Sequence, residues 1–427
     1  MRYDIRLNSD ERDDAAVLSR ADFAELDRAD PLAGWRDRFA LPDGVVYLDG
    51  NSLGALPKAT AATIDDLVRR QWGEDLITSW TRHGWVDLPR RVGAKIARLV
   101  GAGAGEVLVA DSISVNLVKL VAAALQLRPG RTVVLSERTN FPTDLYVVQG
   151  LCDLLGDRLE LRLVEREGLA AALDERTAVL LLSHVDYRSG EVHDMAGLTA
   201  AAHAAGALAL WDLAHSAGAM PLALARDGVD LAVGCGYKYL SGGPGAPAFL
   251  FVAERWQEAA RQPLSGWFGH RDPFAFQPLY HPAAGIDRFQ AGTPPVLSLK
   301  ALEVGVDLLC EVDPAALQAK SRQLGDRFIR LVEERCAGFG LVLASPREPA
   351  RRGAQVAFRH AEGYAVMQAL IARGVIGDFR APDLIRFGFA PLYVRFVDLW
   401  DAGEILRQVL GERTWDRPEF KQRASVT

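Results

Sequence analysis

The middle of the chain alternates short apolar runs rich in β-forming residues with alanine- and leucine-rich stretches of helical character. The apolar runs cover residues 107–109, 132–135, 159–164, 178–182, 207–211, 231–233 and 248–252. Helical stretches, such as residues 115–127 and 198–205, separate most of them. Continuously apolar strands separated by helices predict a mostly parallel sheet sandwiched by helices. We therefore expect an α/β fold with its functional site at the carboxyl ends of the strands.

The pattern changes after Thr293-Pro-Pro295. A helical stretch over residues 296–310 predicts a connector to a second unit. Further helices are expected over residues 314–335, 364–373 and 399–410, and short strands over 341–344, 355–358 and 384–387. We expect a large domain over residues 55–295 and a smaller α+β domain over 296–427. Residues 1–54 contain few apolar patterns that indicate a buried core, and we expect them to pack on the small domain.

A lysine stands at the far end of one apolar run. Lys238 follows residues 231–233 and precedes the glycine-rich turn Ser241-Gly-Gly-Pro-Gly245. Apolar surroundings disfavour an ammonium and make accessible the neutral amine that Schiff-base chemistry requires. Most lysines at strand ends are simply solvated. What distinguishes this lysine is Asp212, at the end of another apolar run. The pair is typical of pyridoxal phosphate enzymes, in which an aspartate faces the pyridinium nitrogen.

Other polar residues follow strand ends or lie within strands. Ser112 and Ser114 lie where a strand passes into a helix. That position suits a phosphate, although taken alone these serines are better explained as plain helix caps. His215 follows Asp212 in a D-x-x-H spacing that would bring both side chains to one ring. Arg386 lies among apolar residues and must find an anion, which is either an intramolecular carboxylate or a bound one.

Composition argues against several classes of function. The net charge is −6 without a basic stripe, so nucleic acid is not an expected partner. Residues 1–10 lack the apolar core of a signal peptide, and no run of about 18 apolar residues suggests a membrane span. The four cysteines form no CxxC pair and the eight histidines show no metal-binding spacing, so neither a metal nor a disulfide framework is expected. A reducing, cytoplasmic setting fits these features.

Seven short stretches carry a family resemblance, in order along almost the whole chain. They are Tyr47-Leu-Asp-Gly-Asn-Ser-Leu-Gly54, Ser114-Val-Asn116, Asn140-Phe-Pro-Thr-Asp-Leu-Tyr146, Trp211-Asp-Leu-Ala-His-Ser-Ala-Gly218, Tyr237-Lys-Tyr-Leu-Ser-Gly-Gly-Pro-Gly245, Gly266-Trp-Phe-Gly-His270 and Arg386-Phe-Gly-Phe-Ala-Pro-Leu-Tyr393. Together they resemble the kynureninase family, within the fold-type I, aminotransferase class V-like pyridoxal phosphate enzymes. The loops around Phe141 and Trp267 are the more specific part, because many relatives share the lysine segment.

The resemblance implies a role for each matching residue. The implied catalytic residues are Lys238, which would bind the cofactor covalently, Asp212 at its pyridinium nitrogen, and Tyr237, which would bind the phosphate and assist proton transfer. The other implied cofactor-binding residues are Ile113, Ser114, Phe141, Pro142, Thr143, Asp144, Ser183 and His215, with Trp267 and Thr293 supplied by the partner subunit of a homodimer. The implied substrate-binding residues are Arg386, at the α-carboxylate, and Ser52 and His83 at the pocket edge. Thr293 resembles the bacterial type of the family, which favours kynurenine over 3-hydroxykynurenine.

The implied reaction is hydrolysis of L-kynurenine to anthranilate and L-alanine, in tryptophan catabolism and NAD biosynthesis. A cysteine desulfurase or selenocysteine lyase would share the fold and the lysine motif but would need a nucleophilic cysteine on a mobile loop. Cys152, Cys310 and Cys336 fall in helical stretches, and Cys235 lies beside a core strand. A non-catalytic pyridoxal phosphate-binding protein would be expected to lose the substrate anchor, yet Arg386 is present.

Overall fold

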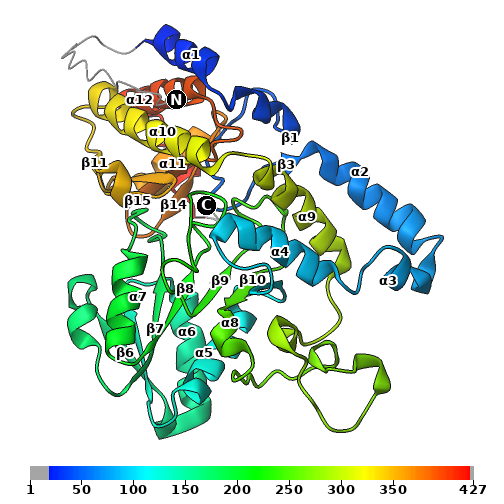
Figure 1. Ribbon diagram of the computed structural model, residues 1–427. Helices are drawn as coiled ribbons and strands as arrows, with labels where there is room; N and C mark the ends of the chain where they lie inside the picture. The colour runs from blue at the N-terminus through cyan, green and yellow to red at the C-terminus, as the bar shows by residue number, and fades with distance from the viewer. Residues whose placement is uncertain (1–18, 424–427) are drawn as a thin grey trace, which may run out of the picture.

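The computed structural model describes residues 19–423, and its centre is a seven-stranded sheet of order β4-β10-β9-β8-β7-β5-β6 (Figure 1). The strands are β4 (Val107–Val109), β5 (Val133–Glu137), β6 (Glu160–Val164), β7 (Thr177–Ser183), β8 (Leu208–Asp212), β9 (Leu231–Gly234) and β10 (Phe249–Val252). Strand β10 is antiparallel to both of its neighbours, whereas β9, β8, β7, β5 and β6 pair in parallel. The predicted mostly parallel sheet is therefore confirmed, and each of the seven apolar runs forms a strand.

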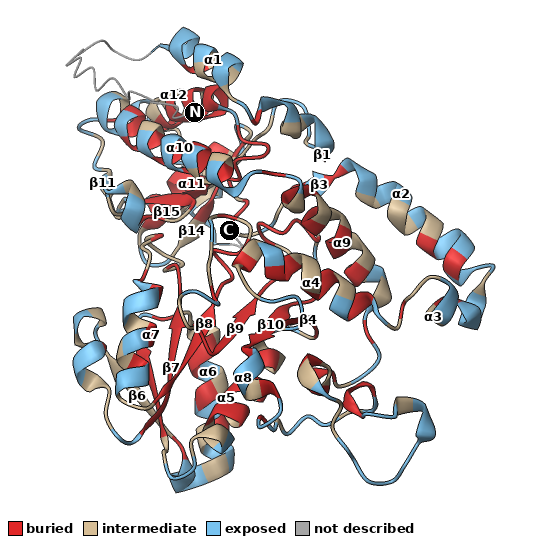
Figure 2. Ribbon diagram, viewed as in Figure 1, coloured by how far each residue is buried: buried red, intermediate tan, exposed pale blue. Residues whose placement is uncertain are grey.

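Alternate residues of each strand point to opposite sides of this sheet, and both sides are buried in every strand except the edge strand β6, whose residues are all partly exposed. On one side, Trp211 and Phe249 belong to a core shared with α4 (Leu88–Val100), α7 (Met195–Ala204) and α9 (Val296–Cys310). On the other side, Leu210 and Leu250 pack with α5 (Ile113–Leu127) and α6 (Pro142–Leu155). Figure 2 shows β7, β8, β9 and β10 as a buried layer between these helices. Burial on both faces explains why the strands read as continuous apolar runs.

The C-terminal part forms a second, antiparallel sheet of order β11-β12-β15-β14. Its strands are β11 (Val342–Leu343), β12 (Gln355–Arg359), β14 (Asp378–Arg380) and β15 (Leu384–Gly388). Its helices are α10 (Pro314–Arg335), α11 (Gly363–Ile371), α12 (Phe396–Gly411) and α13 (Pro418–Lys421). The predicted helices over residues 296–310 and 314–335 have the observed bounds, whereas β14 was not predicted.

The N-terminal segment lies against the C-terminal unit. Helix α1 (Arg20–Ala29) packs along α12, where Arg20 Nε lies 2.7 Å from Asp401 Oδ1. Strand β2 (Val46–Tyr47) pairs in parallel with β13 (Val375–Ile376). These contacts support grouping this segment with the small domain, but the domain bounds at residues 54 and 295 stay predictions. Residues 1–18 of the predicted segment, including the stretch 1–10, lie outside the described residues.

Several short strands and helices lie outside the two larger sheets. They are β1 (Phe39–Ala40), β3 (Leu56–Pro57), α2 (Lys58–Asp66), α3 (Ser79–Arg82) and α8 (Glu254–Gln257). Strands β1 and β3 pair with each other in an antiparallel ladder. Within residues 19–423, no helix has both the length and the apolar character needed to cross a membrane.

Helix α9 passes close to the turn that follows Lys238, and Gly305 is its point of contact. A Cβ atom at Gly305 would collide with the carbonyl oxygen of Leu240, whereas one at Gly150, on the exposed side of α6, would meet nothing within 4 Å. We expect Gly305→Ala to lower the free energy of unfolding by about 1–3 kcal/mol through overpacking. Gly150→Ala should raise it by about 0.5–1 kcal/mol, because glycine weakens a helix interior. Urea unfolding measures both changes, and a Gly305→Ala variant as stable as the parent would contradict this packing.

Candidate active site

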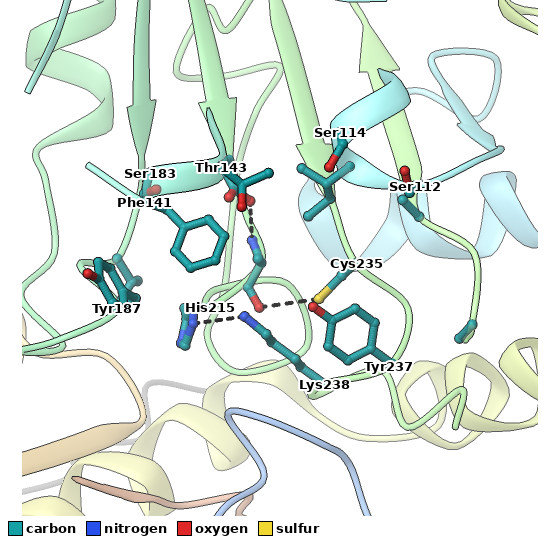
Figure 3. Close-up of a pocket in the computed structure, with 16 residues that line it drawn as sticks. Ser112, Ser114, Phe141, Thr143, Ser183, Tyr187, His215, Cys235, Tyr237 and Lys238 are labelled. Carbon is teal, nitrogen blue, oxygen red and sulfur yellow. Dashed lines mark hydrogen bonds between the residues drawn. The ribbon is translucent and has the colours of Figure 1, made fainter. Parts of the chain in front are cut away.

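A cavity opens at the carboxyl ends of β7, β8 and β9, where parallel strands bring their last residues to one edge of the sheet. Ser183 ends β7, Asp212 ends β8, and Lys238 follows β9 after a short turn. Helices α5 and α6 begin at the same edge. The predicted residues that line the cavity are Ile113, Ser114, Phe141, Thr143, Ser183, Asp212, His215, Tyr237 and Lys238 (Figure 3).

Lys238 extends into the cavity with its amine beside His215 (Figure 3). Its Nζ lies 2.9 Å from His215 Nε2 and 5.9 Å from the centroid of the Phe141 ring. Only 9% of the residue is exposed. Burial lowers the pKa of the Lys238 ammonium, and the charges of Cys235 and Asp212 oppose this effect only in part. The neutral, nucleophilic amine is therefore more accessible here than at an exposed lysine.

Two buried carboxylates, Asp212 and Asp144, lie near this amine. Asp212 Oδ1 accepts a hydrogen bond from the backbone N–H of Ala214 at 2.8 Å. Asp144 Oδ2 accepts from Asn140 Nδ2 at 3.2 Å, while Asp144 Oδ1 has no partner among the described residues. Burial raises the pKa of both carboxyls, and the charge of Asp212 raises that of Asp144 further. A cationic N–H group bound at this place would compensate the buried charge.

Another side of the cavity suits an anion. Ser112 caps α5, with Oγ accepting from the backbone N–H of Val115 at 3.3 Å. The backbone N–H groups of Ile113 and Ser114 lie in the first helical turn, where amides have no acceptor within the helix. Phe141 presents its ring to the cavity near the Lys238 amine and contacts Tyr187 edge-on, with ring centroids 5.2 Å apart (Figure 3). These residues fit pyridoxal 5′-phosphate, which combines a phosphate, an aromatic pyridinium ring and an aldehyde.

A second cavity adjoins the first. It shares Phe141, Tyr187, His215, Tyr237 and Lys238 with the first cavity and adds Asn51, Ser52, Pro142, Arg380 and Arg386. The predicted residues Ser52, Pro142 and Arg386 therefore lie beside the lysine rather than around the phosphate position. Both arginines come from the C-terminal sheet, so the site is built where the two sheets meet.

Arg386 is fully buried in β15 and is held by Asp378. Arg386 Nε donates to Asp378 Oδ1 at 2.8 Å, and Nη2 also contacts the same carboxylate. Nη1 donates to the carbonyl oxygen of Tyr187, and Nη2 donates to Ser52 Oγ at 3.2 Å. Asp378 thus occupies the Nε edge of the guanidinium group. The other edge donates to Tyr187 and Ser52, which line the second cavity. Its paired N–H groups match the geometry of a carboxylate that would replace these two partners.

Apart from the buried Asp144, three predicted residues line neither of these two cavities. Trp267 is 39% exposed, and its ring packs edge-on against Phe268 at 4.4 Å between centroids. Thr293 is exposed in the loop before α9. His83 Nε2 lies 2.7 Å from Asp75 Oδ2. The proposed roles of all three stay predictions, and those of Trp267 and Thr293 require a second subunit.

The structure adds four residues that the sequence did not single out: Tyr187, Gln355, Asp378 and Arg380. Asp378 and Arg380 stand on either side of Phe379 in the sequence. This alternation is typical of a strand and would have placed both charges on one face. Tyr187 and Gln355 carry no comparable signal. Their positions depend on contacts between segments far apart in the chain, such as that of Gln355 with His215.

Solved structures share this fold at low sequence identity. The cysteine desulfurase of Thermococcus onnurineus NA1, solved in its apo form, matches with a TM-score of 0.74 and 18% identity over 89% of this chain and 98% of that one. The cysteine desulfurase CsdA of Escherichia coli matches with a TM-score of 0.71 and 20% identity over 89% and 98%. A C-DES variant with glycine linked to its PLP cofactor reaches 0.76 and 17% over 87% and 98%. The predicted fold-type I architecture is confirmed.

Sequence relatives are much closer. The family model for the kynureninase C-terminal domain matches residues 317–406. The kynureninase of Burkholderia pseudomallei (strain 1106a) is 54% identical over 416 residues, which cover 96% of this chain and 100% of that protein. The kynureninase of Pseudomonas fluorescens is 51% identical over the same shares of the two chains. Because this identity extends over nearly the whole length, the chain belongs to the kynureninase family.

Proposed function

We propose that this protein hydrolyses L-kynurenine to anthranilate and L-alanine, with pyridoxal 5′-phosphate as its cofactor. The observation that carries the proposal is the joining of two cavities at Lys238. One cavity holds the buried carboxylates and the anion-binding helix end, and the other holds Arg386. A small amino acid could therefore be bound by its carboxylate at Arg386 while its amine lies beside Lys238. The kynureninase relatives support the choice of amino acid.

Each residue contributes a separate physical effect. When bound, the cofactor supplies an electron sink that stabilises negative charge on the substrate carbon next to the amine. Lys238 moves the proton at that carbon, because its burial favours the neutral amine. Asp212 would hold the ring nitrogen of the cofactor and, by its negative charge, would favour a proton there. Burial raises the pKa of Tyr237, so its phenol stays neutral and able to donate a hydrogen bond to a phosphate.

We further propose a cytoplasmic homodimer with its active sites at the subunit interface. The exposed aromatic rings of Trp267, Phe274 and Phe276 gather on one loop, an apolar cluster that a monomer rarely leaves uncovered. In the dimer, Trp267 and Thr293 of one subunit would contact the phosphate bound in the other. The free state of all four cysteines supports a reducing compartment. Sedimentation analysis should give a dimer, and a fully active monomer would contradict the shared site.

The substrate can be identified directly. The purified protein loaded with pyridoxal phosphate should convert L-kynurenine to anthranilate, which is followed by its fluorescence, with L-alanine formed in equal amount. 3-Hydroxykynurenine should be cleaved less efficiently. L-Cysteine serves as the control substrate and should release no sulfide, because Cys235, the cysteine nearest to Lys238, is buried and burial raises its thiol pKa. Sulfide release without anthranilate would overturn the proposal in favour of a desulfurase.

A further inference from the structure

His215 is held between Lys238 and Gln355 by both of its ring nitrogens. Nε2 faces Lys238 Nζ at 2.9 Å, and Nδ1 faces Gln355 Oε1 at 3.1 Å. His215 follows β8 in the large sheet, whereas Gln355 opens β12 in the C-terminal sheet. This imidazole ring is therefore one of the links between the two sheets.

The surroundings of Gln355 determine which nitrogen of His215 carries a proton. Gln355 Nε2 donates to the carbonyl oxygens of Asp186 and Tyr187, at 3.3 and 3.1 Å. Carbonyl oxygens only accept, so the amide cannot turn over without losing both bonds. The oxygen of Gln355 therefore faces His215, and because it too can only accept, Nδ1 must carry the proton.

The turn that supplies these two carbonyl groups is tightly held. Asp186 Oδ1 accepts from the backbone N–H of Arg188 at 3.1 Å and from that of Ser189 at 2.6 Å. Gly190 closes the turn with a φ of 75°, a conformation that favours glycine. A Cβ atom at Gly190 would lie 2.8 Å from Gln355 Cγ, so the turn and Gln355 are in direct contact. The direction of the two carbonyl groups is thus fixed against the Gln355 amide.

We propose that Gln355 is a positioning residue that keeps a proton on Nδ1 of His215. Nε2, next to Lys238, is then the ring nitrogen that gains or loses a proton. The inference rests on the proposed function only in taking Lys238 as the reactive amine. Whenever Lys238 carries a free amine, a neutral His215 accepts a hydrogen bond from it and leaves the lysine lone pair free. A cationic His215 donates to that lone pair and blocks it. Gln355 thereby controls the availability of Lys238 without touching it.

The charges around the ring favour the neutral form. Burial lowers the pKa of His215 well below its ordinary value, and the charges of Lys238 and Arg386 lower it further. The titratable and charged groups that face His215 and Lys238 are Asp144, Asp212, Cys235, Arg380 and Arg386, with Tyr237 beside the amine. The carboxylates of Asp144 and Asp212 attract a positive charge on Lys238. At neutral pH the imidazole therefore accepts from Lys238.

The same arrangement connects the substrate anchor with Lys238. The carbonyl oxygen of Tyr187 accepts hydrogen bonds from both Gln355 Nε2 and Arg386 Nη1. Gln355 on β12 lies opposite Gly388 on β15, and Arg386 lies opposite Ala357, so Gln355 and Arg386 are diagonal neighbours on two adjacent strands. A carboxylate that binds the Nη1 edge of Arg386 competes with this carbonyl for the same edge. The carbonyl group of Tyr187 is therefore the contact that Arg386 shares with the amide of Gln355.

The position of the proton can be measured without turnover. In the holoenzyme labelled with ¹⁵N-histidine, His215→Asn assigns the two ring resonances of His215. We expect Nδ1 to stay protonated from about pH 5 to about pH 8, the range in which an ordinary histidine titrates. A proton on Nε2 with a bare Nδ1 would overturn the proposal. The ¹⁵N measurement gives this answer even if the protein forms no anthranilate. Failure to form anthranilate would reject only the proposed function.

Substitutions of Gln355 test whether this residue controls the protonation of His215 and, through it, the reactivity of Lys238. In Gln355→Glu a carboxylate faces Nδ1 and should raise the pKa of His215, so kcat/KM should gain an acid limb that falls about tenfold per pH unit below that pKa. In Gln355→Met both nitrogens are free to hold the proton, and kcat should fall about tenfold at unchanged fold.

Gln408→Glu is the matched control for the added charge. Gln408 lies on α12 and accepts from Arg373 away from both cavities, so no acid limb should appear. A Gln355→Glu enzyme with the parent pH profile, or a Gln408→Glu enzyme with the same new limb, would overturn the positioning role. If either Gln355 variant fails to fold, the ¹⁵N measurement on the unaltered protein still decides the question.

Discussion

Alanine in place of Lys238 is expected to reduce kcat/KM for L-kynurenine by about 10⁴-fold or more, because one side chain both binds the cofactor covalently and moves the substrate proton. The amine is buried beside His215 and Asp212, and no other lysine lines either cavity among the described residues. The visible absorbance of the covalently bound cofactor should be lost with the activity. Borohydride reduction followed by peptide mass spectrometry should find the pyridoxyl group on Lys238 in the parent and on no peptide of the variant.

Two further variants make this result specific. Lys238→Arg keeps a cation at the position but cannot form the covalent link, so it should be as inactive as Lys238→Ala. Lys58→Ala removes an exposed lysine at the start of α2 and should leave both activity and absorbance unchanged. Turnover that survives in Lys238→Ala would reject the assignment of this lysine, whatever the absorbance shows.

The large sheet was predictable because most of its strands are buried on both faces. The helices between them are also long enough to show a helical pattern in the sequence. The run at residues 231–233 has no polar residue, and the structure places it centrally as β9. Strands β1, β2 and β3 were not predicted, because two residues leave no periodicity to detect. Strand β14 is short and charged, so it lacks the apolar signal that marked β15.

The site residues that could be predicted are those that stand at or just after the end of a strand, at the edge of the sheet. Asp212 and Lys238 follow directly from β8 and β9, and the rule for parallel sheets puts both at the same edge. Gln355 and Asp378 could not be placed in this way. Their roles depend on how the C-terminal sheet docks against the large sheet, and no local pattern encodes that geometry. Trp267 and Thr293 need a second subunit, which one chain does not supply.

Replacing Arg386 by lysine is expected to raise KM for L-kynurenine by about 100-fold, because a lysine keeps the charge but loses the paired N–H groups that bind a carboxylate. Lysine is preferable to alanine here. Arg386 is buried against Asp378, and removing the cation would leave that carboxylate unpaired, at a cost of about 3–5 kcal/mol in stability. Steady-state kinetics with anthranilate fluorescence gives KM, and thermal unfolding shows whether the variant is folded.

Arg359→Lys is the matched control for this substitution. Arg359 lies on the neighbouring strand β12 and pairs with both carboxylate oxygens of Asp383 at 2.9 and 3.1 Å, but it is half exposed and lines neither cavity. Its replacement should leave KM unchanged.

The decarboxylated analogue of kynurenine separates carboxylate binding from general damage. It should compete weakly against kynurenine in the parent enzyme, and equally weakly in Arg386→Lys, since the lost contact is one that it cannot make. If Arg386→Lys weakened the analogue as much as kynurenine, the arginine would be supporting the fold of the cavity rather than binding the α-carboxylate.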